Sequence, residues 1–176
     1  MGRTVLLGEP PNVLAEWLER RRALGQDRFD EVWEGDYHVS PEARASHGDV
    51  QDQVSGRLRP LARQRRLWPS GPVNIGTPDN FRVPDLVLLR QRSDAVFLST
   101  AAIVVEVVSP GDESYRKFAF YFAQGVEEVL MVDPVKRSVQ WHARGVAAFE
   151  RAAASAVLEL SGQALGAGID WPPTAE

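Results

Sequence analysis

The stretch AAIVVEVVSPGDESYRK, residues 101–117, places a glutamate in the middle of an apolar run. Five aliphatic residues flank Glu106 closely, and such a run is typical of a strand that is buried on both faces. An unpaired carboxylate in that setting would cost several kcal/mol or would take up a proton. The sequence therefore predicts a partner for Glu106, and the chemistry of that partner should indicate the function.

The composition indicates a soluble globular protein. The chain has 176 residues and no cysteine, with 44% hydrophobic and 25% charged residues, which is typical of a single domain covering residues 1–176. The absence of cysteine excludes disulfides, thiol catalysis and thiolate metal sites. No stretch approaches the ~20 apolar residues of a transmembrane helix, and the apolar patch near residue 5 is too short for a signal peptide. We therefore expect a cytoplasmic protein with no membrane partner.

The charge balance bears on partners. A net charge of −4 is not the profile of a strong non-specific DNA binder, which usually has a basic surplus. Basic residues nevertheless gather at 19–28 and 57–66. A nucleic-acid contact and a solvated helix face both fit these clusters.

Hydrophobic periodicity and turn residues predict an α/β fold with a mixed central sheet flanked by helices, preceded by an N-terminal helix and a β-hairpin. We expect helices at 12–24, at 41–66 with an interruption at Pro60, and at 111–125. We expect the hairpin at 28–41 and strands at 67–76, 81–90, 101–109, 126–133 and 138–143. The segment 146–160 fits either two short strands or a helix.

Asp85 is a second carboxylate that interrupts an apolar strand, in VPDLVLL at residues 83–89. If the two strands are antiparallel neighbours joined by residues 90–101, a turn centred between residues 95 and 96 places Asp85 opposite Glu106. Opposed side chains share a face, with Cβ atoms ~4.5–5.5 Å apart. Two carboxylates so close repel each other unless they share a proton or a divalent cation such as Mg²⁺. Pro84 lacks an N–H, which favours a sheet edge or bulge that is open to substrate.

The segment after Glu106 supplies a cation. Ser114, Lys117, Tyr121 and Gln124 recur at spacings of three, four and three, so they share one face of a helix. This face would carry the Lys117 ammonium toward the carboxylates. A metal ion held by two acids activates a water molecule, and a lysine neutralises charge on the phosphorane, so the set fits phosphodiester hydrolysis. A structural ion pair between Glu106 and Lys117 fits the same residues.

Five motifs, taken in their order along the chain, resemble the Uma-type putative restriction endonucleases, a branch of the PD-(D/E)XK nuclease superfamily. These motifs are DEVWEGDYHVSP, VPDLVLL, VVEVVSP, Lys117 with Tyr121, and GVEEVLMVDP. The resemblance covers residues 29–141. It implies a restriction-endonuclease-like fold, dependence on Mg²⁺ with Mn²⁺ as a substitute, and Asp85 and Glu106 as metal ligands. The usual lysine, two residues after the glutamate, is replaced by Val108, and the resemblance implies that Lys117 takes its role from the helix.

Three further residues are auxiliary candidates. Glu34 matches an acidic position of the family pattern, where it would add a metal ligand or remain a plain turn carboxylate. His47 leads the second helix, where it would polarise a phosphate or water, or cap the helix. Tyr121 would either line the site or pack at the edge of the core.

These observations favour a metal-dependent endonuclease acting on nucleic acid, with DNA as the expected form. The alternative is a catalytically inactive binding or regulatory module on the same fold, which Val108 and the acidic charge favour. A glycosidase fits poorly, because no aromatic subsite pattern accompanies the carboxylate pair. Since an acidic domain offers little basic surface to a duplex, we expect a homodimer, which would double that surface.

Overall fold

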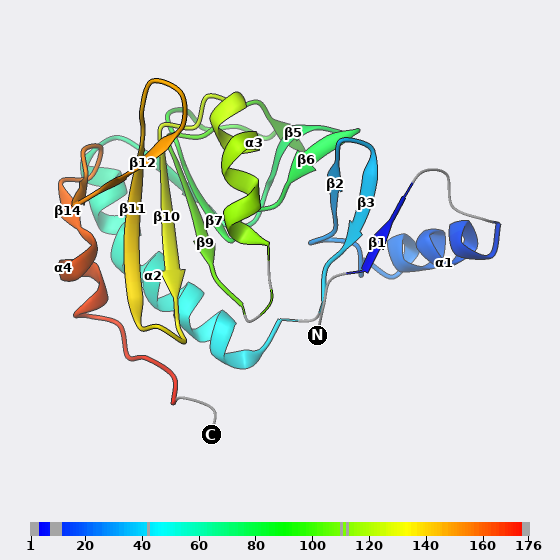
Figure 1. Ribbon diagram of the computed structural model, residues 1–176, viewed down its shortest axis with the longest axis horizontal. Helices are drawn as coiled ribbons and strands as arrows, with labels where there is room; N and C mark the ends of the chain where they lie inside the picture. Colours follow the sequence, from blue (N-terminus) through cyan, green and yellow to red (C-terminus); the bar gives the residue numbers. More distant parts are fainter. Residues whose placement is uncertain (1–3, 8–11, 42, 110, 112, 174–176) are drawn as a thin grey trace.

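The strands of the computed structural model form two six-stranded sheets and a two-stranded one over the residues it describes, 4–7, 12–41, 43–109, 111 and 113–173 (Figure 1). In the first sheet the order is β1 (Thr4–Leu6), β3 (Asp36–Val39), β2 (Glu31–Trp33), β6 (Asn80–Arg82), β5 (Asn74–Thr77), β8 (Phe97–Leu98). In the second sheet it is β12 (Phe149–Ala152), β11 (Ser138–Arg144), β10 (Glu128–Asp133), β9 (Ile103–Val107), β7 (Leu86–Leu89), β4 (Trp68–Ser70). The small sheet pairs β13 (Ala154–Ser155) with β14 (Leu160–Ser161).

The second sheet is mixed and lies between helices, as predicted. β9 runs parallel to β10 and antiparallel to β7. Alternate residues of β9 enter two different cores, because successive side chains of a strand point to opposite faces. Helix α2 (Ala45–Gln64) covers one face, and the 3₁₀ turn η1 (Ser114–Lys117) with helix α3 (Phe118–Ala123) covers the other (Figure 1).

The register between β7 and β9 confirms the pairing predicted from the sequence. Leu86 pairs with Val105, and Leu88 pairs with Ile103. Extending this register by one residue places Asp85 opposite Glu106. The connection between the strands is not a simple turn, however, because residues 97–98 form β8, which pairs with β5 of the first sheet.

The predicted single strand at 81–90 is wrong. Residues 80–82 form β6 of the first sheet, and residues 86–89 form β7 of the second. Pro84 lies between the two strands, and its missing N–H explains why the ladder does not continue through it. The chain therefore crosses from one sheet to the other directly before Asp85.

The second helix is confirmed with narrower bounds, but the predicted interruption at Pro60 is wrong. Pro60 lies inside the continuous helix α2. The proline removes one backbone hydrogen bond, and the burial of Val54, Leu58 and Ala62 on both sides of it offsets that loss.

The two ends of the chain differ in how they pack. The N-terminal helix is confirmed as α1 (Asn12–Ala23), but none of its residues is buried, and with β1 it lies at one end of the molecule (Figure 1, blue). The segment 146–160 adopts strands, and the short helix α4 (Gly162–Gly166) follows β14 and packs on β11. No helix in the described part of the chain is long and apolar enough to span a membrane.

Candidate active site

Lys117 is the partner that the sequence predicts for Glu106. Its Nζ lies 3.1 and 3.2 Å from the two carboxylate oxygens of Glu106 and 2.8 Å from Oε1 of Glu31. All three side chains are buried, with Glu31 0%, Glu106 3% and Lys117 5% exposed. One ammonium is thus held between two carboxylates, one from each large sheet.

The surroundings of Glu106 change its acidity. Burial raises the pKa of its carboxyl group from 4.5 to about 7, the Lys117 ammonium opposes this rise, and the charges of Asp85 and Glu31 add to it. The hydroxyl of Tyr121 donates a hydrogen bond of 2.5 Å to Oε1 of Glu106. Burial, and then the charge of Glu106, raises the pKa of Tyr121 well above its usual value, so that this group remains a neutral donor.

Glu31 is the residue of this cluster that the sequence reasoning missed. Its Oε1 also accepts the Val83 N–H at 2.8 Å, and its Oε2 accepts the indole N–H of Trp33 at 2.7 Å. Glu31 and Trp33 are two residues apart in one strand, so they share a face. An acid on the same face as a tryptophan was the available signal for a buried carboxylate.

Asp85 occupies the crossing between the sheets and is the more accessible acid, with 19% of its side chain exposed. Its Oδ2 accepts the Val107 N–H at 2.7 Å, and its Oδ1 lies 3.0 Å from Nε2 of His47. Nδ1 of His47 in turn lies 3.1 Å from the Ser109 hydroxyl. The structure therefore brings His47 to Asp85, where it holds the carboxylate in place.

A hollow of about 300 Å³ opens beside Asp85 on the side of α2. Its lining consists of Gly48, Gln51, Asp52, Ser55, Arg59, Gly71, Asp85 and Leu86. The amide of Gln51 donates to the backbone carbonyl of Asp85 at 2.8 Å and fixes this edge of the hollow. A ligand can thus reach Asp85 without passing through either core.

Glu34 is not part of the acidic cluster. Its carboxylate, 68% exposed, lies 3.1 Å from a guanidinium nitrogen of Arg82. The Arg82 guanidinium lies over the rings of Trp33 and Phe120, at 4.3 and 4.1 Å from their centroids. Glu34 therefore joins the β2–β3 turn to this stacked arginine. Val108, in the place of the superfamily's usual lysine, packs against the apolar core beside α3.

The donor atoms of the site suit a hard divalent cation. Asp85 and Glu106 offer carboxylate oxygens, which Mg²⁺ prefers, and a cation near Glu106 would favour its ionised form. Within the described ranges, no group of three or more acidic, histidine or cysteine side chains has the arrangement of a metal site. A two-carboxylate site completed by water remains compatible with this arrangement.

The fold is that of a mixed α/β protein with helices on both faces of its second sheet. The family model described as Uma2, putative restriction endonuclease, matches residues 15–170, and the chain belongs to this family. A solved structure of similar fold is a putative nuclease belonging to DUF820 from Anabaena variabilis ATCC 29413, with a TM-score of 0.65 and 16% identity. The similarity covers 78% of this chain and 89% of that chain. No curated protein matches the sequence.

Proposed function

We propose that this protein is a metal-dependent endonuclease that hydrolyses phosphodiester bonds of nucleic acid, with DNA as the expected substrate. The observation that carries the proposal is the position of Asp85 opposite Glu106 at the ends of the neighbouring strands β7 and β9, with the Lys117 ammonium 3.1 Å from Glu106. The chain also belongs to a family described as putative restriction endonucleases. We further propose that the chain acts as one domain in the cytoplasm, since a chain without cysteine suits a reducing compartment.

Asp85 and Glu106 are the proposed ligands of Mg²⁺, with Mn²⁺ as a substitute. The bound metal would supply an acidified water molecule and positive charge near the phosphate. His47 and the Val107 N–H orient Asp85, because each contacts a different oxygen of its carboxylate. Tyr121 orients Glu106 in the same way through its hydroxyl.

Lys117 is the proposed stabiliser of charge on the phosphorane. Its ammonium lies between Glu31 and Glu106, so it is positioned before any substrate arrives. Glu31 is a positioning residue in this scheme, since it holds the ammonium from the side of the first sheet.

We propose that part of the substrate lies along the hollow on the α2 side of Asp85, while Lys117 acts from the α3 side of the sheet. Arg59 is part of its lining and is held by a hydrogen bond of 2.8 Å from its Nε to the Ser55 hydroxyl. A guanidinium in this position fits a backbone phosphate next to the scissile one. We therefore propose Arg59 as a phosphate contact of the nucleic acid.

A second candidate function is a non-catalytic binding or regulatory module. The buried ion pairs of Lys117 with Glu31 and Glu106 favour it, because they neutralise the cluster without a metal. It predicts that the protein binds no divalent cation.

Calorimetric titration of Mn²⁺ into the native protein, Glu106→Gln and Asp85→Asn distinguishes the two functions. The nuclease proposal requires binding by the native protein that both variants lose. Asp52→Asn is the matched control, because Asp52 lines the same hollow without contacting the cluster, and it should keep the metal. Lys117→Ala should bind Mn²⁺ and lose cleavage of plasmid DNA. A native protein that binds no Mn²⁺, while Glu106→Gln is folded, supports the non-catalytic module.

We also propose that the protein is a homodimer. The net charge of −4 limits the basic surface that one copy offers to nucleic acid, and a two-fold pair would double it.

A further inference from the structure

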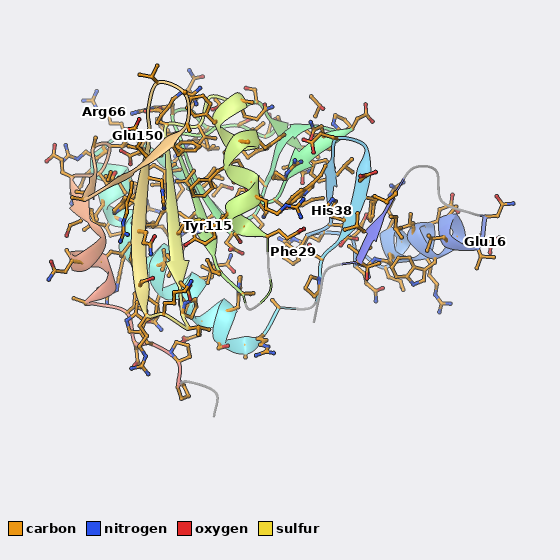
Figure 2. All side chains as sticks on the ribbon, in the orientation of Figure 1. Glu16, Phe29, His38, Arg66, Tyr115 and Glu150 are labelled. Carbon is orange, nitrogen blue, oxygen red and sulfur yellow. The ribbon has the colours of Figure 1, made fainter. Side chains whose placement is uncertain are left out.

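Exposed apolar side chains are concentrated in the N-terminal arm, defined here as residues 4–7 and 12–29. Among the described residues, six of the ten large apolar side chains that are exposed belong to this arm. They are Val5, Leu7, Val13, Trp17, Leu24 and Phe29. Helix α1 buries none of its residues, and Figure 2 places Glu16 of this helix at the opposite end of the molecule from Arg66 and Glu150. The arm thus presents apolar surface that the other described residues leave exposed.

The exposed apolar residues of α1 and its last turn lie on one face. Val13, Trp17, Arg20 and Leu24 recur at spacings of four, three and four, and they are called here the α1 stripe. Leu24 belongs to the last turn, since its N–H donates to the Arg20 carbonyl at 3.1 Å. Val13 is 80% and Leu24 60% exposed. On another face of this 12-residue helix Leu14, Leu18 and Arg21 are half-buried, and no residue of the helix is fully buried. The stripe is therefore apolar surface that a covering chain would bury, and such burial would stabilise a short helix.

We propose that a second copy of this chain covers the α1 stripe, with the two α1 helices packed antiparallel about a two-fold axis. In such a pair, positions whose numbers add to 37 face each other. Val13 then packs on the partner copy's leucine at position 24, and the Trp17 ring faces the arginine at position 20. Apolar groups meet at both ends of the stripe, and two guanidinium–indole contacts form at its centre.

The charges of the arm favour this arrangement over others. A parallel pair would bring the two copies of Arg20 against each other, and like charges at that distance repel. Residues 12–29 contain four arginines, Glu16, Glu19 and Asp27, and so lack the strong basic surplus that would favour an anionic lipid surface or nucleic acid. The Trp17 ring already holds the Arg21 guanidinium at 5.0 Å and remains 41% exposed, so part of it is open to a second cation.

Strand β1 adds to the same surface. It is the last strand of the first sheet among the described residues, and it pairs on one side, with β3. Its exposed Val5 and the following Leu7 lengthen the apolar surface of the arm. An edge strand beside an exposed helix is a common feature of surfaces that associate with another chain.

Disulfide cross-linking tests the proposed register, because the chain has no cysteine of its own. The full chain carrying Val13→Cys and Leu24→Cys should form a covalent dimer on mild oxidation, visible on a non-reducing gel. The matched control carries Val13→Cys and Arg22→Cys, since Arg22 lies on the opposite side of α1, and it should run as a single chain on the same gel. Equal cross-linking of both variants, or none in the first, would overturn the proposal.

Sedimentation equilibrium supplies a second test without new cysteines. The native chain should be dimeric at micromolar concentration, and Arg20→Glu should weaken association about tenfold or more. Arg22→Glu makes the same change of charge on the other side of the helix and should leave association unchanged. A native chain that is monomeric at about 100 µM, or equal effects of the two substitutions, would refute the interface. Both tests omit metal and nucleic acid, so their outcome is independent of the proposed nuclease activity.

Discussion

Replacing Glu106 with glutamine should change how stability depends on pH in the metal-free protein. The folded state raises the pKa of this carboxyl group from 4.5 to about 7. Between these values the folded protein binds a proton that the unfolded chain has released, so the free energy of unfolding falls as pH rises through this window. The difference of about 2.5 in pKa corresponds to roughly 3 kcal/mol at full ionisation. Glutamine keeps the shape of the side chain and does not titrate.

Urea unfolding with EDTA at about pH 5 and about pH 8.5 measures this difference in both proteins. We expect the stability of the native protein relative to Glu106→Gln to fall by about 2–3 kcal/mol over that range. The histidines are common to both proteins and cancel in the comparison. Glu34→Gln is the control, because it changes an exposed carboxylate. A native-to-variant difference that stays constant, or that rises with pH, would mean that Lys117 fully compensates the burial of Glu106, and the reasoning would fail.

Three further predictions concern the groups around this carboxylate. Lys117→Met should lower the free energy of unfolding by roughly 3–5 kcal/mol, because it leaves two buried acids without a cation. Lys136→Met removes an exposed lysine and should leave the free energy of unfolding nearly unchanged; equal losses for the two variants in urea unfolding would contradict this. Trp33→Phe removes the donor to Glu31 and should cost about 1–2 kcal/mol in the same assay; an unchanged midpoint would show that this hydrogen bond contributes little. Glu34→Gln should leave the Mn²⁺ affinity within about twofold of the native value, since Glu34 pairs with an arginine away from the cluster. A tenfold loss of Mn²⁺ affinity, measured by calorimetry, would mean that Glu34 belongs to the metal site.

The pairing of Asp85 with Glu106 could be predicted because each acid interrupts an apolar strand. Two such interruptions, together with the length of the connection, define a register, and the contacts of Leu86 and Leu88 in β7 follow it. The approach of Lys117 could be predicted for a similar reason, since helical spacing places it on one face with Tyr121. In both cases the local periodicity of the sequence was sufficient to predict which side chains lie close together.

Glu31 could not be recognised in the same way. Its place on one face with Trp33 indicates that this face of the hairpin is buried, but it does not identify what covers the face. Its burial depends on contacts with residues far along the chain, such as Val83 and Lys117, and local periodicity carries no information about them. The α1 stripe shows the same limit, because a helical pattern indicates that a face needs a cover but does not identify the molecule that covers it.

Because the chain crosses from one sheet to the other at Asp85, the proposed site is assembled only when both sheets have folded. The cluster takes Glu31 from the first sheet, Glu106 from the second and Lys117 from the turn that follows. A chain still emerging from the ribosome has no assembled site before Lys117 has been translated and the two sheets have docked. A fragment cut between the sheets would lose the same assembly. On the proposed function, cleavage of nucleic acid would therefore begin only in fully folded copies of the protein.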